Sequence, residues 1–361
     1  MKDWIHKLSQ FTSAVDSVVD EVRGQVAYTL GIEDPIRILP YRGYGTLDNL
    51  LVKGRVLKDE GIKLKEEGAS VFENLCNMYK RFATDEVPNA LLKVRLDTIE
   101  KEVVTDKEGF FNLEVQLNER LAEPIEWCPV DISLINPEPD GNAVLGQAEV
   151  LIVGERASFG VISDIDDTIV HTAATDLLKM IKIVYLGNAE SRKPFDQVAE
   201  FYQALQQGKK EGKTNPIFYV SSSAWNMYDV FVRFMELNGI PKGPIFLKDV
   251  ELSLEKIFAF KHEVHKLEQI EPIFKRFPHL PFLLIGDSGQ KDPEIYTTLI
   301  EQYPDQILGI MIRDVVPGNA QRRHEIEQLT AKIATYGCEL FMFKETREAI
   351  AYATRQGWVA A

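Results

Sequence analysis

Two aspartates stand where an apolar run ends, near the middle of the chain. Asp164 and Asp166 follow residues 159–162, and because side chains alternate in an extended chain, both carboxylates can point to one side. Two such carboxylates repel each other and any anionic substrate unless one is protonated or a divalent cation lies between them. The pair therefore indicates either a cation site or, together with Thr168, the N-terminal cap of a helix that begins near Ile169.

Hydroxyl and carboxyl side chains also follow the next two apolar runs. Ser221 and two further serines come after residues 217–220, where hydroxyls and amides at a helix start can hold an anion or simply cap the helix. Asp287 and Asp292 come after residues 281–285, on either side of a turn that contains glycine. Taken alone, each of these features is as typical of a turn or a cap as of a binding site.

If the three apolar runs are neighbouring strands of one parallel sheet, the polar residues that follow them lie at the same edge. Ligands bind at that edge, beyond the carboxyl ends of the strands. Lys266 opens a helical stretch between the second and third runs, from which it can reach the same edge. An isolated lysine is usually a solvated surface residue, and only the order of the motifs singles this one out. Acids, serines and a lysine at one edge are the ingredients of a magnesium phosphate site, which unrelated caps are not expected to assemble.

The elements that must position these residues change along the chain. In residues 156–361, apolar runs of four to six residues alternate with helical stretches, which predicts an α/β domain with a parallel sheet buried on both faces. In residues 33–155, apolar residues alternate with polar ones, which predicts a small all-β sandwich domain with one helix near 69–83. The chain is therefore expected to hold two folded domains behind an N-terminal segment.

Two segments away from the candidate site also carry clear patterns. Residues 1–32 contain an apolar stripe from Trp4 onward at steps of three or four, which predicts an amphipathic helix. Helices on membrane surfaces are usually basic and this one is acidic, so packing on the protein itself is favoured over a bilayer. In the sandwich, residues 106–109 are predicted to form the turn between strands at 91–96 and 111–117, with glycine supplying the positive φ.

Composition narrows the class of protein. The 361 residues are 45% hydrophobic and 27% charged, which is typical of a globular chain of about two domains. The formal net charge of -14 disfavours nucleic acid as a partner. The three cysteines are scattered and no Cys-x-x-Cys pair occurs, so neither a disulfide framework nor a zinc site is predicted, and a reducing cytosol fits. No apolar stretch approaches the roughly 18 residues of a membrane span, so we expect a cytoplasmic protein, with peripheral membrane contact left open.

The order of these motifs resembles the four-motif signature of the haloacid dehalogenase superfamily of phosphotransferases, over about residues 156–340. More narrowly, the chain resembles bacterial members of the actin-patch-protein type phosphatidate phosphatase family. The strings that carry this resemblance in the second half are Ser163-Asp-Ile-Asp-Asp-Thr-Ile169, Tyr219-Val-Ser-Ser-Ser-Ala-Trp-Asn226, Gly239-Ile-Pro-Lys-Gly-Pro244 and Ile285-Gly-Asp-Ser-Gly-Gln-Lys-Asp-Pro-Glu-Ile-Tyr296. Upstream, it extends to Tyr41-Arg-Gly-Tyr-Gly-Thr46 and Gly54-Arg-Val56.

The resemblance implies a Rossmann-like parallel sheet of the haloacid dehalogenase type and a phosphatase that works through an aspartyl-phosphate. Asp164 would be the nucleophile, and Asp166 would protonate the leaving alkoxide and then deprotonate the hydrolytic water. The implied cofactor is Mg²⁺. Its ligands would be Asp164, the backbone carbonyl of Asp166, Asp287 and, directly or through water, Asp292.

The resemblance also assigns the phosphate-binding residues and the substrate class. Ser221 and Lys266 would bind the transferring phosphoryl oxygens of a phosphomonoester. The resemblance favours a lipid phosphate such as phosphatidate, for which the family is named. Residues 171–216 are few for a full lid, and an open site agrees with a bulky substrate or a membrane surface but does not require one.

Two alternatives remain, and the protein partner is open. The first is the same chemistry on a phosphoprotein, a nucleotide or a polynucleotide end, although the net charge counts against the polynucleotide. The second is a binding protein with a vestigial phosphatase domain, and the presence of all the motif acids argues against such decay.

Overall fold

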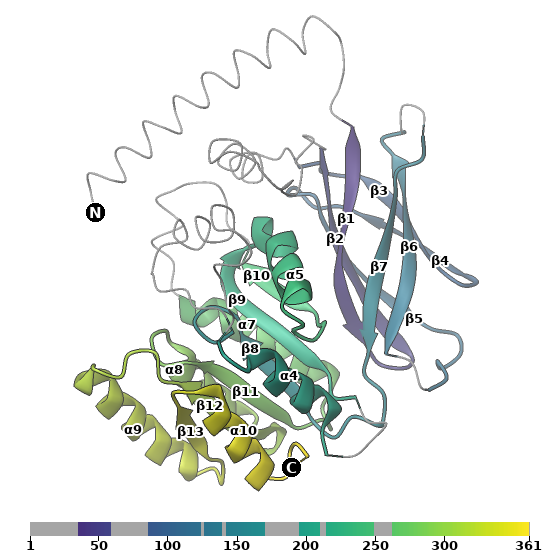
Figure 1. Ribbon diagram of the computed structural model, residues 1–361. Helices are drawn as coiled ribbons and strands as arrows, with labels where there is room; N and C mark the ends of the chain where they lie inside the picture. The colour runs from purple at the N-terminus through teal and green to yellow at the C-terminus, as the bar shows by residue number, and fades with distance from the viewer. Residues whose placement is uncertain are drawn as a thin grey trace, which may run out of the picture.

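A computed structural model describes the chain in two units, one mixed β-sheet and one parallel sheet covered by helices (Figure 1). The predicted helices at 1–32 and near 69–83 lie outside the described residues. Those residues are 35–58, 86–123, 126–138, 142–169, 195–209, 214–248 and 262–360.

Six parallel strands form the sheet that carries the candidate site, in the order β10-β9-β8-β11-β12-β13. They are β8 (Gly160–Asp164), β9 (Ile217–Ala224), β10 (Ile245–Lys248), β11 (Phe282–Asp287), β12 (Ile307–Arg313) and β13 (Leu340–Phe343). Most of their residues are buried, as strands covered on both faces must be. The strand order changes direction between β8 and β11, and sheets of this kind bind ligands beyond the carboxyl ends at such a point.

Helices cover both faces of the parallel sheet (Figure 1). Apolar side chains of α4, α5 and α10 pack in one cluster with the strands, and those of α7, α8 and α9 pack in a second. The helices, with two short 3-10 helices marked η, are α4 (Val198–Gln207), η2 (Trp225–Met227), α5 (Tyr228–Leu237), α7 (His262–Arg276), α8 (Asp292–Gln302), η3 (Pro304–Gln306), α9 (Ala320–Ala334) and α10 (Thr346–Arg355).

The first unit is one continuous seven-stranded sheet, in the order β4-β3-β6-β7-β1-β2-β5. Its strands are β1 (Ile36–Gly45), β2 (Asn49–Lys58), β3 (Leu91–Leu96), β4 (Ile99–Val104), β5 (Phe110–Gln116), β6 (Trp127–Asn136) and β7 (Leu145–Ile152). A sandwich would have two separate sheets. Here β1 pairs with β2 on one side and β7 on the other, so the two halves are joined, and the outermost strands β4 and β5 approach each other around a common apolar core.

The turn at 106–109 joins different strands from the pair that the sequence predicts. Gly109 has the expected positive φ of 77°. The turn leads from β4 into β5, because the charged stretch Ile99–Val104 forms an additional strand paired with β3. All six side chains of β4 are partly or fully exposed, so β4 lacks the apolar alternation by which a half-buried strand is recognised.

The seven-stranded sheet packs against the β9–β10 end of the parallel sheet (Figure 1). The Tyr44 ring on β1 lies 5.6 Å from Phe218 and 5.5 Å from Phe246, measured between ring centroids. Tyr41 and Leu151 likewise belong to the apolar clusters of the parallel sheet. Residues of the first unit are therefore part of both apolar clusters of the second.

Cys128 and Cys338 are buried free thiols, and Cys76 lies outside the described residues. Within the described ranges, no helix combines the length and the apolar character needed to cross a membrane.

Candidate active site

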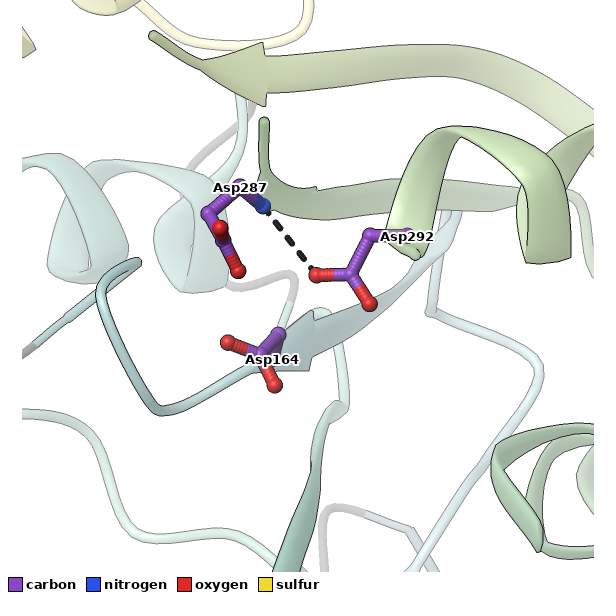
Figure 2. Close-up of side chains that lie close together, drawn as sticks. All are labelled: Asp164, Asp287 and Asp292. Atoms are coloured by element: carbon purple, nitrogen blue, oxygen red, sulfur yellow. Dashed lines mark hydrogen bonds between the residues drawn. The ribbon is translucent and has the colours of Figure 1, made fainter. Parts of the chain in front are cut away.

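Three carboxylates meet at the carboxyl ends of β8 and β11. Asp164 is the last residue of β8, Asp287 is the last residue of β11, and Asp292 is the first residue of α8. One oxygen from each lies within 4.8 Å of the others, and their side chains point toward a common space (Figure 2). All three are almost completely buried. Clustered carboxylate oxygens are the donor set that Mg²⁺ and Ca²⁺ prefer.

Lys266 reaches this cluster from the first turns of α7. Its Nζ donates to Asp164 Oδ1 at 2.7 Å and to Asp292 Oδ1 at 2.5 Å, and the side chain is 2% exposed. Burial alone would lower the pKa of Lys266, but the two carboxylates outweigh burial and hold the pKa above its ordinary value. The lysine is therefore a fixed positive charge inside the cluster.

Asp287 uses its two oxygens differently. Oδ1 accepts hydrogen bonds from the backbone N–H groups of Gly289 at 2.7 Å and Gln290 at 2.9 Å, which holds the turn after β11. Oδ2 is buried, and within the described part of the chain it has no hydrogen-bond partner; the same is true of Asp164 Oδ2. The turn-forming role and the cation-binding role that the sequence leaves open are thus compatible in one side chain. A buried carboxylate oxygen without a donor fits a cation ligand.

Burial raises the pKa of both Asp164 and Asp287. For Asp164 the Lys266 ammonium opposes burial, while neighbouring carboxylates act in the same direction as burial, and the pKa lies well above its usual value. Burial, with a further rise from the Asp292 carboxylate, brings the pKa of Asp287 to about 8. A single lysine does not compensate three buried carboxylates, so a divalent cation would relieve the remaining repulsion.

Asp166 lies beside Ser221 and Ser223, which follow the part of β9 that pairs with β8. Its Oδ2 accepts a hydrogen bond from Ser221 Oγ at 2.6 Å and a longer one from Ser223 Oγ at 3.4 Å. Burial raises the pKa of Asp166, and the hydrogen bond from Ser221 only partly opposes that rise. A carboxyl group with a raised pKa is suited to hold and release a proton.

The serines do not cap the helices that follow them. Neither η2 nor α5 has a hydrogen bond from a capping side chain, and β9 continues through the serines as far as Ala224. Ser223 N–H instead donates to Ser221 Oγ at 3.0 Å. Of the predicted site residues, Asp164, Lys266, Asp287 and Asp292 form one contact group, and Asp166 with Ser221 forms a second beside it.

Three further residues shape the site and were not assigned roles from the sequence. Ser223 supports Asp166 together with Ser221, and its i, i+2 spacing from Ser221 on an extended chain was the available signal. Gln290 Nε2 donates to the Asp166 carbonyl oxygen at 3.5 Å. Gly286 leaves room for Asp292, since a Cβ at that position would lie 2.5 Å from Asp292 Oδ2.

Comparison with known proteins points to one family. The curated relatives include phosphatidate phosphatase APP1 of Saccharomyces cerevisiae, 37% identical over 241 residues, which are 64% of this chain and 39% of that protein. An uncharacterized protein of Schizosaccharomyces pombe is 23% identical over 240 residues, covering 66% of this chain and 38% of that protein. The chain thus spans about two fifths of the length of these relatives.

Solved structures add nothing to this comparison. A carbohydrate acetylesterase from Xanthomonas citri aligns with 80% of this chain and 72% of its own, at 11% identity and a TM-score of 0.26. A similarity of that size carries no argument about fold or activity.

The family match covers the segment that contains all six candidate site residues: Asp164, Asp166, Ser221, Lys266, Asp287 and Asp292. It runs over residues 159–314, from the start of β8 to the end of β12. It confirms the predicted resemblance over this segment: residues 159–314 match the family described as phosphatidate phosphatase APP1, catalytic domain.

Proposed function

We propose that this protein is a Mg²⁺-dependent phosphomonoesterase of the haloacid dehalogenase type, which hydrolyses phosphatidate or another lipid phosphate through an aspartyl-phosphate. The family match over residues 159–314 supports the phosphatase activity and the lipid phosphate class of substrate. The parallel sheet supports the assignment of the fold type, because its acids lie at the carboxyl ends of β8 and β11, where the order of the strands changes direction.

One observation carries the metal dependence in this proposal. Asp164, Asp287 and Asp292 bring carboxylate oxygens within 4.8 Å of one another, and two of those side chains keep a buried oxygen without a partner among the described residues. These three residues would hold the ion. When bound, Mg²⁺ would neutralise charge on the phosphoryl oxygens and on the carboxylates around them.

The chain's own residues supply the remaining chemistry. An Asp164 oxygen attacks phosphorus as the bond to the leaving oxygen breaks, and Asp166 donates a proton to that oxygen, so the alcohol departs neutral. Asp166, now ionised, then takes a proton from the water that attacks the phosphorus of the aspartyl-phosphate, which releases phosphate and restores the Asp164 carboxylate. Lys266 holds Asp164 in place and offers its charge to the phosphoryl group.

The decisive experiment is a substrate screen of the purified protein with Mg²⁺. The panel contains phosphatidate in mixed micelles, a nucleoside monophosphate, a phosphopeptide and p-nitrophenyl phosphate, each assayed with Mg²⁺ and with excess chelator. We expect phosphatidate to be hydrolysed with the highest kcat/KM and all activity to be lost in chelator. Full activity in chelator contradicts the metal site, and a preference for the nucleotide or the phosphopeptide contradicts the lipid assignment.

A further inference from the structure

Ser221 and Ser223, which contact Asp166, and Ser222 between them receive little support from the sheet in which they lie. Val220 is the last residue of β9 that pairs with β8, opposite Asp164. On the other side, Val220 faces Phe246 and Ala224 faces Lys248, so the register with β10 shifts by two residues across this stretch. Ser221–Ser223, here called the serine segment, therefore lies outside regular strand pairing on both sides.

Trp225, two residues after the serine segment, packs against the seven-stranded sheet. The Trp225 ring stacks on Tyr41 of β1, with 4.3 Å between centroids and 22° between ring planes. Phe110 of β5 meets the same tryptophan ring edge-on at 6.0 Å. Aromatic pairs at such distances add stability beyond the apolar area that they bury.

Hydrogen bonds connect Asn226 and Tyr228, which follow Trp225, to the same sheet. The Arg42 backbone N–H donates to the Tyr228 hydroxyl at 2.7 Å, and Arg55 Nη1 donates to Asn226 Oδ1 at 3.4 Å. The Arg55 guanidinium also lies over the Phe110 ring, 4.3 Å from its centroid. Buried contacts of this kind restrict the position of the chain more than exposed ones do.

These contacts give a role to two motifs that the catalytic chemistry does not use. Tyr41 and Arg42 belong to the upstream string that begins at Tyr41, and Arg55 belongs to Gly54-Arg-Val56. All three residues are buried where the seven-stranded sheet contacts the parallel-sheet unit, a contact region here called the joint. Few residues separate the joint from Asp166. Trp225 is two residues from Ser223, and Ser223 and Ser221 both donate hydrogen bonds to Asp166.

We infer that Tyr41 is a positioning residue of the phosphatase reaction: through its stack with Trp225 it fixes the serine segment, and the serine segment fixes the carboxyl group of Asp166. The seven-stranded sheet is then part of the catalytic apparatus, in addition to any contact that it makes with a partner. This inference rests on the proposed function, in which Asp166 protonates the leaving alkoxide.

A misplaced proton donor has a kinetic signature that a loss of folded protein lacks. Nitrophenolate leaves readily without a proton, whereas the alkoxide of phosphatidate needs one, and general acid catalysis contributes about 10²- to 10⁴-fold. The ratio kcat/KM reports the steps up to departure of the leaving group. A variant with a misplaced Asp166 therefore loses more kcat/KM on the alkyl ester, whereas a partly unfolded variant loses the same factor on both substrates.

The test uses the full chain and three variants at temperatures where each is folded. Tyr41→Leu removes the stack, and Tyr41→Phe keeps the ring. Tyr44→Leu is the matched control, because Tyr44 is an equally buried tyrosine of β1 at the joint whose ring contacts Phe218 and Phe246 within the sheet. Each is assayed with dioctanoyl phosphatidate and with p-nitrophenyl phosphate, and the amide hydrogen exchange of residues 217–227 is measured in parallel.

We expect Tyr41→Leu to lower kcat/KM for dioctanoyl phosphatidate about tenfold more than for p-nitrophenyl phosphate, and to speed exchange in the serine segment. Tyr41→Phe should restore both readouts, and Tyr44→Leu should change the two substrates equally. Equal losses on both substrates in Tyr41→Leu, or exchange no faster than in Tyr44→Leu, would overturn the inference. Absence of activity in the unaltered protein refutes the proposed function and the kinetic role together, while the exchange measurement still decides whether Tyr41 holds the serine segment.

Discussion

Asp164 is the residue on which the chemistry depends most directly. Asp164→Asn keeps the size of the side chain but removes the nucleophilic oxygen, so we expect kcat to fall by several orders of magnitude. The fold should persist, because the change also removes one of three mutually repelling buried carboxylates. Steady-state kinetics and thermal unfolding of the same sample check both expectations.

A neighbouring aspartate provides the control for this experiment. Asp167 has φ of 57°, a left-handed conformation that asparagine adopts as readily as aspartate does. Asp167→Asn therefore removes a carboxylate three residues away without strain, and its kcat should stay within a few fold of the unaltered protein. A kcat near normal in Asp164→Asn would show that another residue is the nucleophile.

Asp287 makes the stability of the metal-free protein depend on pH. Its folded pKa of about 8 stands against an ordinary value of 3.8, so between these values the folded protein keeps a proton that the unfolded chain has released. Stability is therefore full below about pH 4, falls as pH rises toward about 8, and then levels off. In excess chelator, Tm should fall from pH 5 to pH 8, less steeply in Asp287→Asn, and added Mg²⁺ should raise Tm most at pH 8. An identical slope in the variant would rule out this titration.

The turn between β11 and α8 sets the geometry of the acids at the level of whole elements. A Cβ at residue 286 would lie 2.6 Å from the Cβ of Asp292 and 2.8 Å from its Cγ, so alanine there must displace the Asp292 side chain. We expect Gly286→Ala to raise the Mg²⁺ concentration for half-maximal activity about 10- to 100-fold, as loss of a ligand's support commonly does. Gly318→Ala is the control, since no atom lies within 4 Å of the added methyl. Equal Mg²⁺ dependence in both variants would contradict this role for the glycine.

Elements that are buried on both faces are the ones that the sequence predicts well. β11 and β12 are interior strands of the parallel sheet and continuous apolar runs, so the sequence predicts their positions and the acids that follow β11. β10 has only four residues, and β4 is charged and exposed, so neither shows the repeat of apolar residues by which a strand is recognised. The Tyr41–Trp225 stack could not be predicted, because it depends on how two units dock.

The two units should unfold together as one molecule. Tyr41, Tyr44 and Leu151 of the first unit lie inside the apolar clusters of the second, and Arg276 Nη1 donates across the joint to Asn49 Oδ1 at 2.8 Å. Shared cores of this kind couple unfolding. Calorimetry should show a single transition whose calorimetric and van't Hoff enthalpies agree. Two separate transitions would show that the joint is weak, and would count against its proposed role in catalysis.

The lysine within the acid cluster has a consequence for charge stoichiometry. Three carboxylates and one ammonium leave two negative charges when all are ionised, which is equal and opposite to one divalent ion. The filled site would thus be electrically neutral, and an arriving phosphate dianion would meet no net repulsion from it. Lys266→Met leaves three negative charges, and should shift selectivity toward a trivalent ion. Terbium luminescence titrated against Mg²⁺ would reveal this as a larger ratio of Tb³⁺ to Mg²⁺ affinity, and an unchanged ratio would mean that Lys266 does not set the valence that the protein accepts.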